Sequence, residues 1–204
     1  TEIITIVGAL AGSLEGAGIG VGLDVTVLVK NTEAWIAASD TAMTPTDVHA
    51  DGNITVEADS SEDIFSLTVN VGVSGGGDDD DDNSVAGAGG AVVLVLDTDT
   101  RAFAGRDPLA EIPAVGNVVL SSDGSTLIAA DSTTEVDASA GSAGVTLDGD
   151  AFGASVAVVI DIDETEAFVG EDAEVTALGN GTAIGVRDGN FEGEAANQPG
   201  APSL

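Results

Sequence analysis

Short runs of alternating apolar and polar residues, bounded by small or polar residues, follow one another along this chain. In Asp24–Lys30 the valines at positions 25, 27 and 29 alternate with Asp, Thr and Lys, which places the valines on one face of a strand. We expect that face to be the buried one, so that replacing Val27 by Asp costs several kcal/mol. Similar apolar runs span Val92–Leu96 and Val156–Ile160. Gly, Asp, Asn and Ser bound these runs and turn chains, so the pattern predicts many short strands.

An internal repeat organises these runs. The pentad Asn31–Trp35 is followed by Asp99–Phe103 and Glu164–Phe168, and the aromatic residues that end the three pentads are 68 and 65 residues apart. A second landmark keeps nearly the same period. It is the dipeptide Gly-Asn, found at 52–53, 116–117 and 179–180. Two landmarks that share a period indicate a true repeat, which is typical of solenoid proteins.

The repeat predicts an all-β parallel solenoid. Strand-like segments occur about every 20–24 residues, so a unit of about 65 residues is expected to form three coils and the chain eight or nine. On that basis Trp35, Phe103 and Phe168 would lie roughly 14 Å apart and would not contact one another. A near absence of Asn-Gly hairpin turns disfavours the alternative, an antiparallel β-sandwich. A lack of helical segments between the strands disfavours a βαβ fold.

We expect residues 1–190 to form a single solenoid domain, with an acidic loop at 75–84, and residues 191–204 to form an irregular tail that contains two prolines. Strand-like residues begin at Thr1–Val7 with no charged or helical cap before them. Open sheet edges invite pairing with another chain. The sequence therefore suits either a segment cut from a longer rod or a subunit that stacks end to end.

The net charge of −32 limits the kinds of molecule that this chain can bind. Such a chain repels nucleic acid and anionic membrane surfaces, and its apolar runs are far shorter than a membrane span. With no cysteine there is no disulfide and no thiolate metal site. Nothing in the residues requires a cofactor. Calcium, which prefers oxygen ligands, is the candidate ion for the many carboxylates.

The three units, which read "VLVKNTEAWIA", "VLVLDTDTRAFAG" and "VVIDIDETEAFVG", resemble the repeats of very large bacterial filamentous adhesins. These are the haemagglutinin-like and leukotoxin-type exoproteins of type V secretion. The resemblance covers about residues 15 to 190. It implies a right-handed parallel β-helix, export to the bacterial cell surface, and a structural or adhesive role with a host-cell or matrix ligand.

The candidate site residues are acidic. Five aspartates follow three glycines in the predicted loop, and this run is either a solvated acidic loop or a weak calcium site: Asp78, Asp79, Asp80, Asp81 and Asp82. It lacks the ligand spacing of an EF-hand. Aspartates two residues apart share a face of a strand and either hold a cation between coils or are exposed turn residues: Asp97 and Asp99, Asp148 and Asp150, Asp161 and Asp163.

No catalytic group is signalled. His49 is the single histidine, so any Ser-His-Asp triad would have to use it. A polysaccharide lyase or hydrolase is the enzyme alternative, but four basic residues are few for an acidic sugar substrate. Threonine is too irregularly spaced for an ice-binding face. We therefore expect a non-catalytic adhesive segment, or alternatively a filament subunit whose partners are the coils of identical chains.

Overall fold

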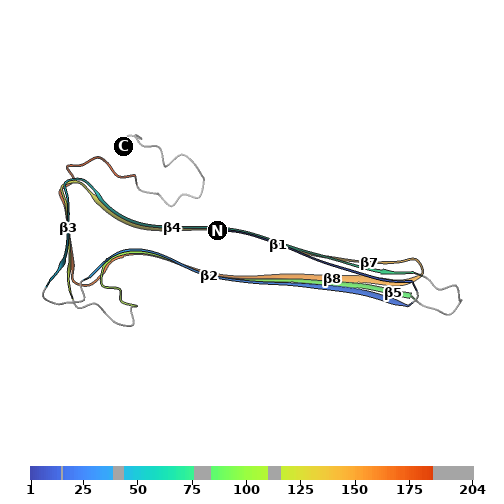
Figure 1. Cartoon of the computed structure of the whole chain (residues 1–204). Coiled ribbons are helices and arrows are strands. Elements are labelled where there is room, and N and C mark those ends of the chain that lie inside the picture. The colour runs from blue at the N-terminus through green and yellow to red at the C-terminus, as the bar shows by residue number, and fades with distance from the viewer. Residues whose placement is uncertain (15, 39–43, 76–83, 110–115, 186–204) are drawn as a thin grey trace. The chain divides into compact units, whose positions relative to one another are not determined.

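The computed structural model describes residues 1–14, 16–38, 44–75, 84–109 and 116–185, and within these ranges every helix or strand is a β-strand (Figure 1). The strands are β1 (Glu2–Ser13), β2 (Ala17–Ala37), β3 (Thr46–Ala50), β4 (Ile54–Ser74), β5 (Ser84–Gly105), β6 (Val118–Ser122), β7 (Thr126–Thr146), β8 (Gly149–Val169) and β9 (Ala173–Ala177). The predicted tail, 191–204, and most of the predicted acidic loop lie outside the described residues.

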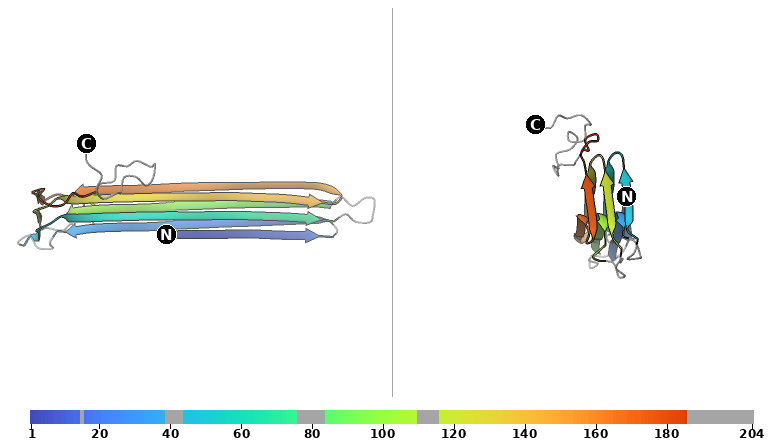
Figure 2. Two further views of the ribbon diagram at one scale, coloured as in Figure 1. Left: turned by 90° about the horizontal axis from the view of Figure 1, so that it is seen from above. Right: turned by 90° about the vertical axis from the view of Figure 1, so that its left-hand side faces the viewer.

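The nine strands form three parallel sheets, ordered β1-β4-β7, β2-β5-β8 and β3-β6-β9. Strands of successive coils lie side by side in each sheet (Figure 2). The prediction of an all-β parallel, solenoid-like fold is therefore confirmed. The chain divides into two compact units. Unit 1 comprises residues 1–32, 59–100 and 131–165, and unit 2 comprises residues 33–58, 101–130 and 166–204.

Each sequence unit of about 65 residues forms one coil, because it contributes one strand to each sheet. Our expectation of three coils per unit, and of eight or nine coils in the chain, is wrong. The error lies in the expectation that small residues bound short strands. The runs of small residues at 16–22 and 86–90 fall almost entirely inside β2 and β5, which are 21 and 22 residues long.

Small residues occupy these strands because the two sheets of unit 1 approach backbone to backbone there. A Cβ atom built on Gly72 of β4 would lie 1.9 Å from the carbonyl oxygen of Gly87 in β5. One on Gly18 of β2 would lie 2.1 Å from the carbonyl oxygen of Val73. No side chain fits at such distances, so glycine here permits the close approach of two strands and marks no turn.

Only one of the two sequence landmarks is in register. Trp35, Phe103 and Phe168 end equivalent stretches of β2, β5 and β8, as their stacking shows. The Gly-Asn dipeptides are not all equivalent. Gly52 is hydrogen-bonded to Gly124, and Gly124 in turn to Gly179. Asn117 lies just before β6 instead, where its carbonyl accepts a bond from Thr46, the first residue of β3. The middle Gly-Asn dipeptide is therefore not equivalent to the other two, because the coils differ in length at their corners.

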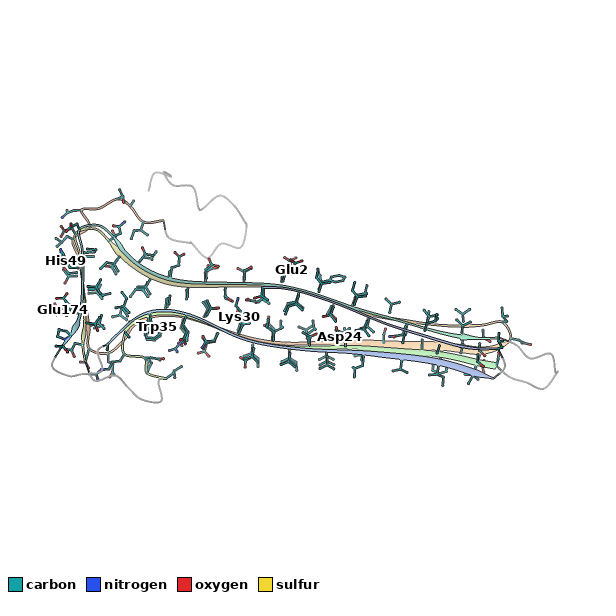
Figure 3. All side chains as sticks on the ribbon, viewed as in Figure 1. Glu2, Asp24, Lys30, Trp35, His49 and Glu174 are labelled. Atoms are coloured by element: carbon teal, nitrogen blue, oxygen red, sulfur yellow. The ribbon has the colours of Figure 1, made fainter. Side chains whose placement is uncertain are left out.

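The alternation along β2 is inverted relative to our expectation. The valines at positions 25, 27 and 29 point outward and are 57%, 62% and 73% exposed. The other face of β2 carries Asp24 and Lys30, which point toward β4, as Figure 3 shows. Period-2 alternation defines two faces but not which one is buried. In β2 the inward face belongs to the smaller and more polar set.

The apolar core of unit 1 is concentrated around its central strands. Ile64 of β4 packs with Val92, Leu94 and Leu96 of β5, all fully buried. In the middle coil, apolar residues thus fill the part of the interior where the sheets leave room, and smaller residues fill the rest.

Unit 2 has a separate core. One buried cluster joins β4, β5 and β6 through Ile54, Ala104, Val118 and Leu120. The short strands β3, β6 and β9 pair in strict register, with Val48 beside Leu120 and Leu120 beside Val175. This third sheet carries the alternating inward residues that complete the unit 2 core.

Candidate functional site

A charged network lies between the two sheets of unit 1. Lys30 Nζ donates to Ser60 Oγ at 3.0 Å and forms an ion pair with Glu62 Oε1. The Ser60 hydroxyl also donates to Glu62 Oε1, at 3.0 Å. The Glu62 side chain is fully buried and that of Lys30 is 26% exposed. Removing either charge would leave the other largely desolvated, so the pair ties β2 to β4.

A second buried carboxylate lies closer to the glycine-rich part of β2. Asp24 is 5% exposed and accepts hydrogen bonds from Ser66 Oγ at 2.5 Å and from Thr26 Oγ1 at 3.3 Å. Both Asp24 and Glu62 therefore serve inter-sheet contacts and are not presented to a ligand on the surface.

Several further polar atoms of this interior have no hydrogen-bond partner within the described part of the chain. They include Glu62 Oε2, both polar atoms of the Asn70 side chain, and the hydroxyl oxygens of Thr68, Thr98, Thr100, Ser132 and Thr134. Buried oxygens of this kind are normally satisfied by ordered water. The described residues include no group of three or more Asp, Glu, His or Cys side chains placed to hold a metal ion.

Unit 2 contains a cationic clamp centred on Arg101, whose side chain is 4% exposed. Its two terminal nitrogens donate to both oxygens of Asp107, at 2.7 and 3.1 Å. Glu33 and Glu166 lie on either side, 3.6 and 3.4 Å from guanidinium nitrogens. The hydrogen bonds from Arg101 hold the pKa of Asp107 below its ordinary value, against the opposing effect of burial, and the Leu109 backbone N–H lowers it further.

An aromatic column runs beside this clamp. The rings of Trp35 and Phe103 are stacked at 6.3 Å between centroids, and those of Phe103 and Phe168 at 5.0 Å. The guanidinium of Arg101 lies 5.4 and 5.5 Å from the two phenylalanine rings. Our expectation that these aromatics do not contact one another is wrong, since one sequence unit makes one coil.

The single histidine lies in an exposed position on β3. His49 Nδ1 is 3.4 Å from Ser121 Oγ on the neighbouring strand, and its Nε2 is 3.6 Å from Asp51. The three residue types of a hydrolytic triad thus occur together. However, the Asp51 side chain is 98% exposed. The 3.4 Å between His49 Nδ1 and Ser121 Oγ is also long for a hydrogen bond. A buried carboxylate that orients the imidazole is the feature such triads depend on.

The paired aspartates are not brought together. Asp97 and Asp99 lie on the outward face of β5, whereas Asp161 and Asp163 share the inward parity of β8. Aspartates of adjacent coils therefore point to opposite sides of one sheet. Asp148 lies between β7 and β8, where its backbone carbonyl accepts bonds from Ser84 and Thr146. The run Asp78, Asp79, Asp80, Asp81 and Asp82 lies outside the described residues.

The comparisons with known proteins give no relative: no family model, no curated protein and no solved structure matches this chain. No helix that could cross a membrane occurs among the described residues.

Sequence reasoning missed the clamp and the aromatic column, although both were visible in the repeat. The third position of the pentad is Glu33, then Arg101, then Glu166, and its fifth is aromatic in every copy. Stacked in register, these positions give an acid–base–acid row and an aromatic row. The signal was present, but it could be interpreted only with the correct coil length.

Proposed function

We propose that this chain is a non-catalytic structural and adhesive segment of a secreted bacterial surface protein, built as a right-handed parallel β-helix. The observation that carries the proposal is the in-register stacking of successive sequence units, seen in the column Trp35–Phe103–Phe168. A unit that stacks on its own copy can be repeated many times without a new core. Right-handed crossovers are the general rule for parallel strands.

The adhesive part of the proposal draws on the surface of unit 1. Large apolar side chains are exposed along β1, namely Ile4 at 62%, Ile6 at 69% and Leu10 at 79%. Exposed apolar surface of this extent is typical of interaction sites. Calcium, which would reduce the repulsion among 36 carboxylates, is the ion proposed to act outside the cell.

A flow-adhesion assay tests this function. Beads coated with the full chain are passed over host epithelial cells and over immobilised matrix proteins, with and without millimolar calcium. Beads coated with polyaspartate at equal charge density are the control for acidity alone. Saturable retention of the protein-coated beads above this control supports adhesion. Equal retention of both bead types contradicts it.

A second candidate is a self-assembling filament or matrix subunit that stacks end to end. Inward positions of β2, β5 and β8 form rows across unit 1, and one row runs from Lys30 through Thr98 to Asp163. The row has a cation on the edge strand β2 and a carboxylate on the opposite edge strand β8. In a head-to-tail stack of two copies, Asp163 of one would meet Lys30 of the next.

Negative-stain electron microscopy separates the two candidates. Uniform thin filaments that are lost in Asp163→Lys, a variant with like charges at the junction, would establish the assembly subunit. Separate particles at all concentrations would exclude it and leave the adhesive segment. Images with and without millimolar calcium show whether the ion drives assembly.

A further inference from the structure

The outer surface of sheet β2-β5-β8 in unit 1 is an apolar face with nothing packed on it among the described residues. The hydrogen bonds at the ends of β2 and β5, from Val85 to Gly16 and from Ala38 to Gly105, set the register of these two strands, and that from Gly170 to Ala104 sets that of β5 and β8. The outward positions between Ile19 and Val29, with their neighbours on β5 and β8, form what we call the valine face. Its large side chains are Ile19, Val21, Leu23, Val25, Val27, Val29, Val93, Val95, Phe152, Val156, Val158, Ile160 and Ile162.

The valine face is almost free of charge on a chain of net charge −32. Asp97, beside Val29 at one end, is the sole charged residue among its outward positions. The opposite outer surface, on β1-β4-β7, differs. There Glu2 lies beside Asp63, and Phe65 is followed in the next coil by polar residues of β7 such as Asp137. Towards its other end that surface is apolar as well, with Leu10, Val73 and Val145 exposed. The two surfaces therefore differ in charge, and the valine face is the one that carries a single charged residue.

The size of the face matches what a dimer needs. Eleven residues at about 3.3 Å each and three strands at about 4.8 Å give a footprint of roughly 36 by 14 Å, or about 500 Å² per copy. Two copies would bury about 1,000 Å², the lower bound for a specific interface. A flat surface of β-branched side chains with a two-residue period is also the surface that packs on another sheet in a sandwich.

We propose that the valine face binds the same face of a second copy of this chain, in a sheet-on-sheet dimer. A positively charged partner would bind the acidic surfaces of the chain, because the almost uncharged valine face offers it few ion pairs. The stretch 186–204 of the same chain offers only Val186, Phe191 and Leu204 as large apolar residues, too few to cover the face. This inference goes beyond the proposed function and does not depend on adhesion.

Salt should strengthen the dimer, because the contact is apolar and the copies carry like charge. Raising NaCl from about 0.05 M to about 1 M shortens the screening length from roughly 14 Å to about 3 Å, and we expect the dissociation constant to fall about tenfold or more. A contact held by charge complementarity would weaken under the same change.

Sedimentation velocity of the full chain from about 1 µM to about 100 µM brackets the affinities expected for an interface of this size. The diagnostic variant is Val93→Lys, at the centre of the face on β5, where the side chain is only partly buried. Val69→Lys, on the outer surface of β4 and 48% exposed, is the matched control. Both variants add one positive charge, so any general relief of repulsion is equal. Far-UV circular dichroism verifies that both fold.

A salt-strengthened dimer that Val93→Lys abolishes and Val69→Lys retains supports the proposal. Four results overturn it. They are a wild-type monomer at every concentration and salt level, a dimer lost only in Val69→Lys, open-ended polymers that Val93→Lys leaves intact, and a monomer that co-sediments with phosphatidylcholine vesicles. The last result would assign the face to lipid.

Discussion

Truncation of Leu94 to alanine tests which face of β5 is buried. Leu94 is fully buried and packs with Ile64, Val92 and Leu96, whereas its neighbour Val95 points outward and is partly exposed. Leu94→Ala removes three carbon atoms from an interior whose walls are hydrogen-bonded ladders on both sides. Because such walls relax little, we expect the free energy of unfolding to fall by about 3 kcal/mol, in the middle of the range usual for such truncations.

The matched variant is Val95→Ala, which removes two carbons from the outward face and should cost below about 1 kcal/mol. For a chain of this size, a loss of 3 kcal/mol lowers the melting temperature by roughly 6–12 °C. Urea unfolding of both variants, followed by circular dichroism at low micromolar concentration, gives the free energies directly. Equal losses, or a larger loss in Val95→Ala, would refute the assigned faces.

Four further predictions follow from the same packing. Val27→Asp should leave the melting temperature within about 2 °C of wild type in dilute solution, because the side chain is 62% exposed; a collapse in stability would mean that Val27 points inward. Gly72→Ala should prevent cooperative folding or lower its midpoint strongly in thermal scans, since the added Cβ would meet the Gly87 carbonyl at 1.9 Å. Arg101→Gln should cost about 2–3 kcal/mol in urea unfolding, with no rescue by lysine, because planar bidentate bonds to Asp107 are lost. The lowered pKa of Asp107 means that its stabilisation is fully present above the ordinary aspartate pKa and is lost as pH falls through the folded-state value; the free-energy difference between wild type and Asp107→Asn should therefore shrink in acid, and a constant difference would contradict it.

The fold class was accessible from the sequence because its determinants are local and repeated. Alternating short runs predict strands, and the recurrence of the pentad ending at Trp35, Phe103 and Phe168 predicts parallel stacking. The coil length was not accessible in the same way. Glycine is both a turn former and the residue that permits two backbones to touch, and sequence alone does not separate these uses at Gly18 or Gly72.

The buried face was mispredicted for a related reason. The rule that apolar residues face inward holds when the two faces differ mainly in polarity. In β2 they differ also in size, and the closely spaced sheets admit the smaller set. Polar residues such as Asp24 are tolerated inside because Ser66 and Thr26 satisfy the carboxylate. Such pairings between distant segments depend on register, which no local pattern specifies.

Disulfide cross-linking between β3 and β6 tests most directly the central claim, that one sequence unit makes one coil. The chain has no cysteine, so His49→Cys/Ser121→Cys introduces a single pair on register partners of adjacent strands. His49→Cys/Thr176→Cys, two strands and about 10 Å apart, is the control. The account predicts an intramolecular disulfide in the first variant and none in the second, measured by intact mass and by mobility in non-reducing gels. With three coils per unit, positions 49 and 121 would lie roughly 14 Å apart, too far for a bond. Failure of the first pair to cross-link in folded protein would contradict the account.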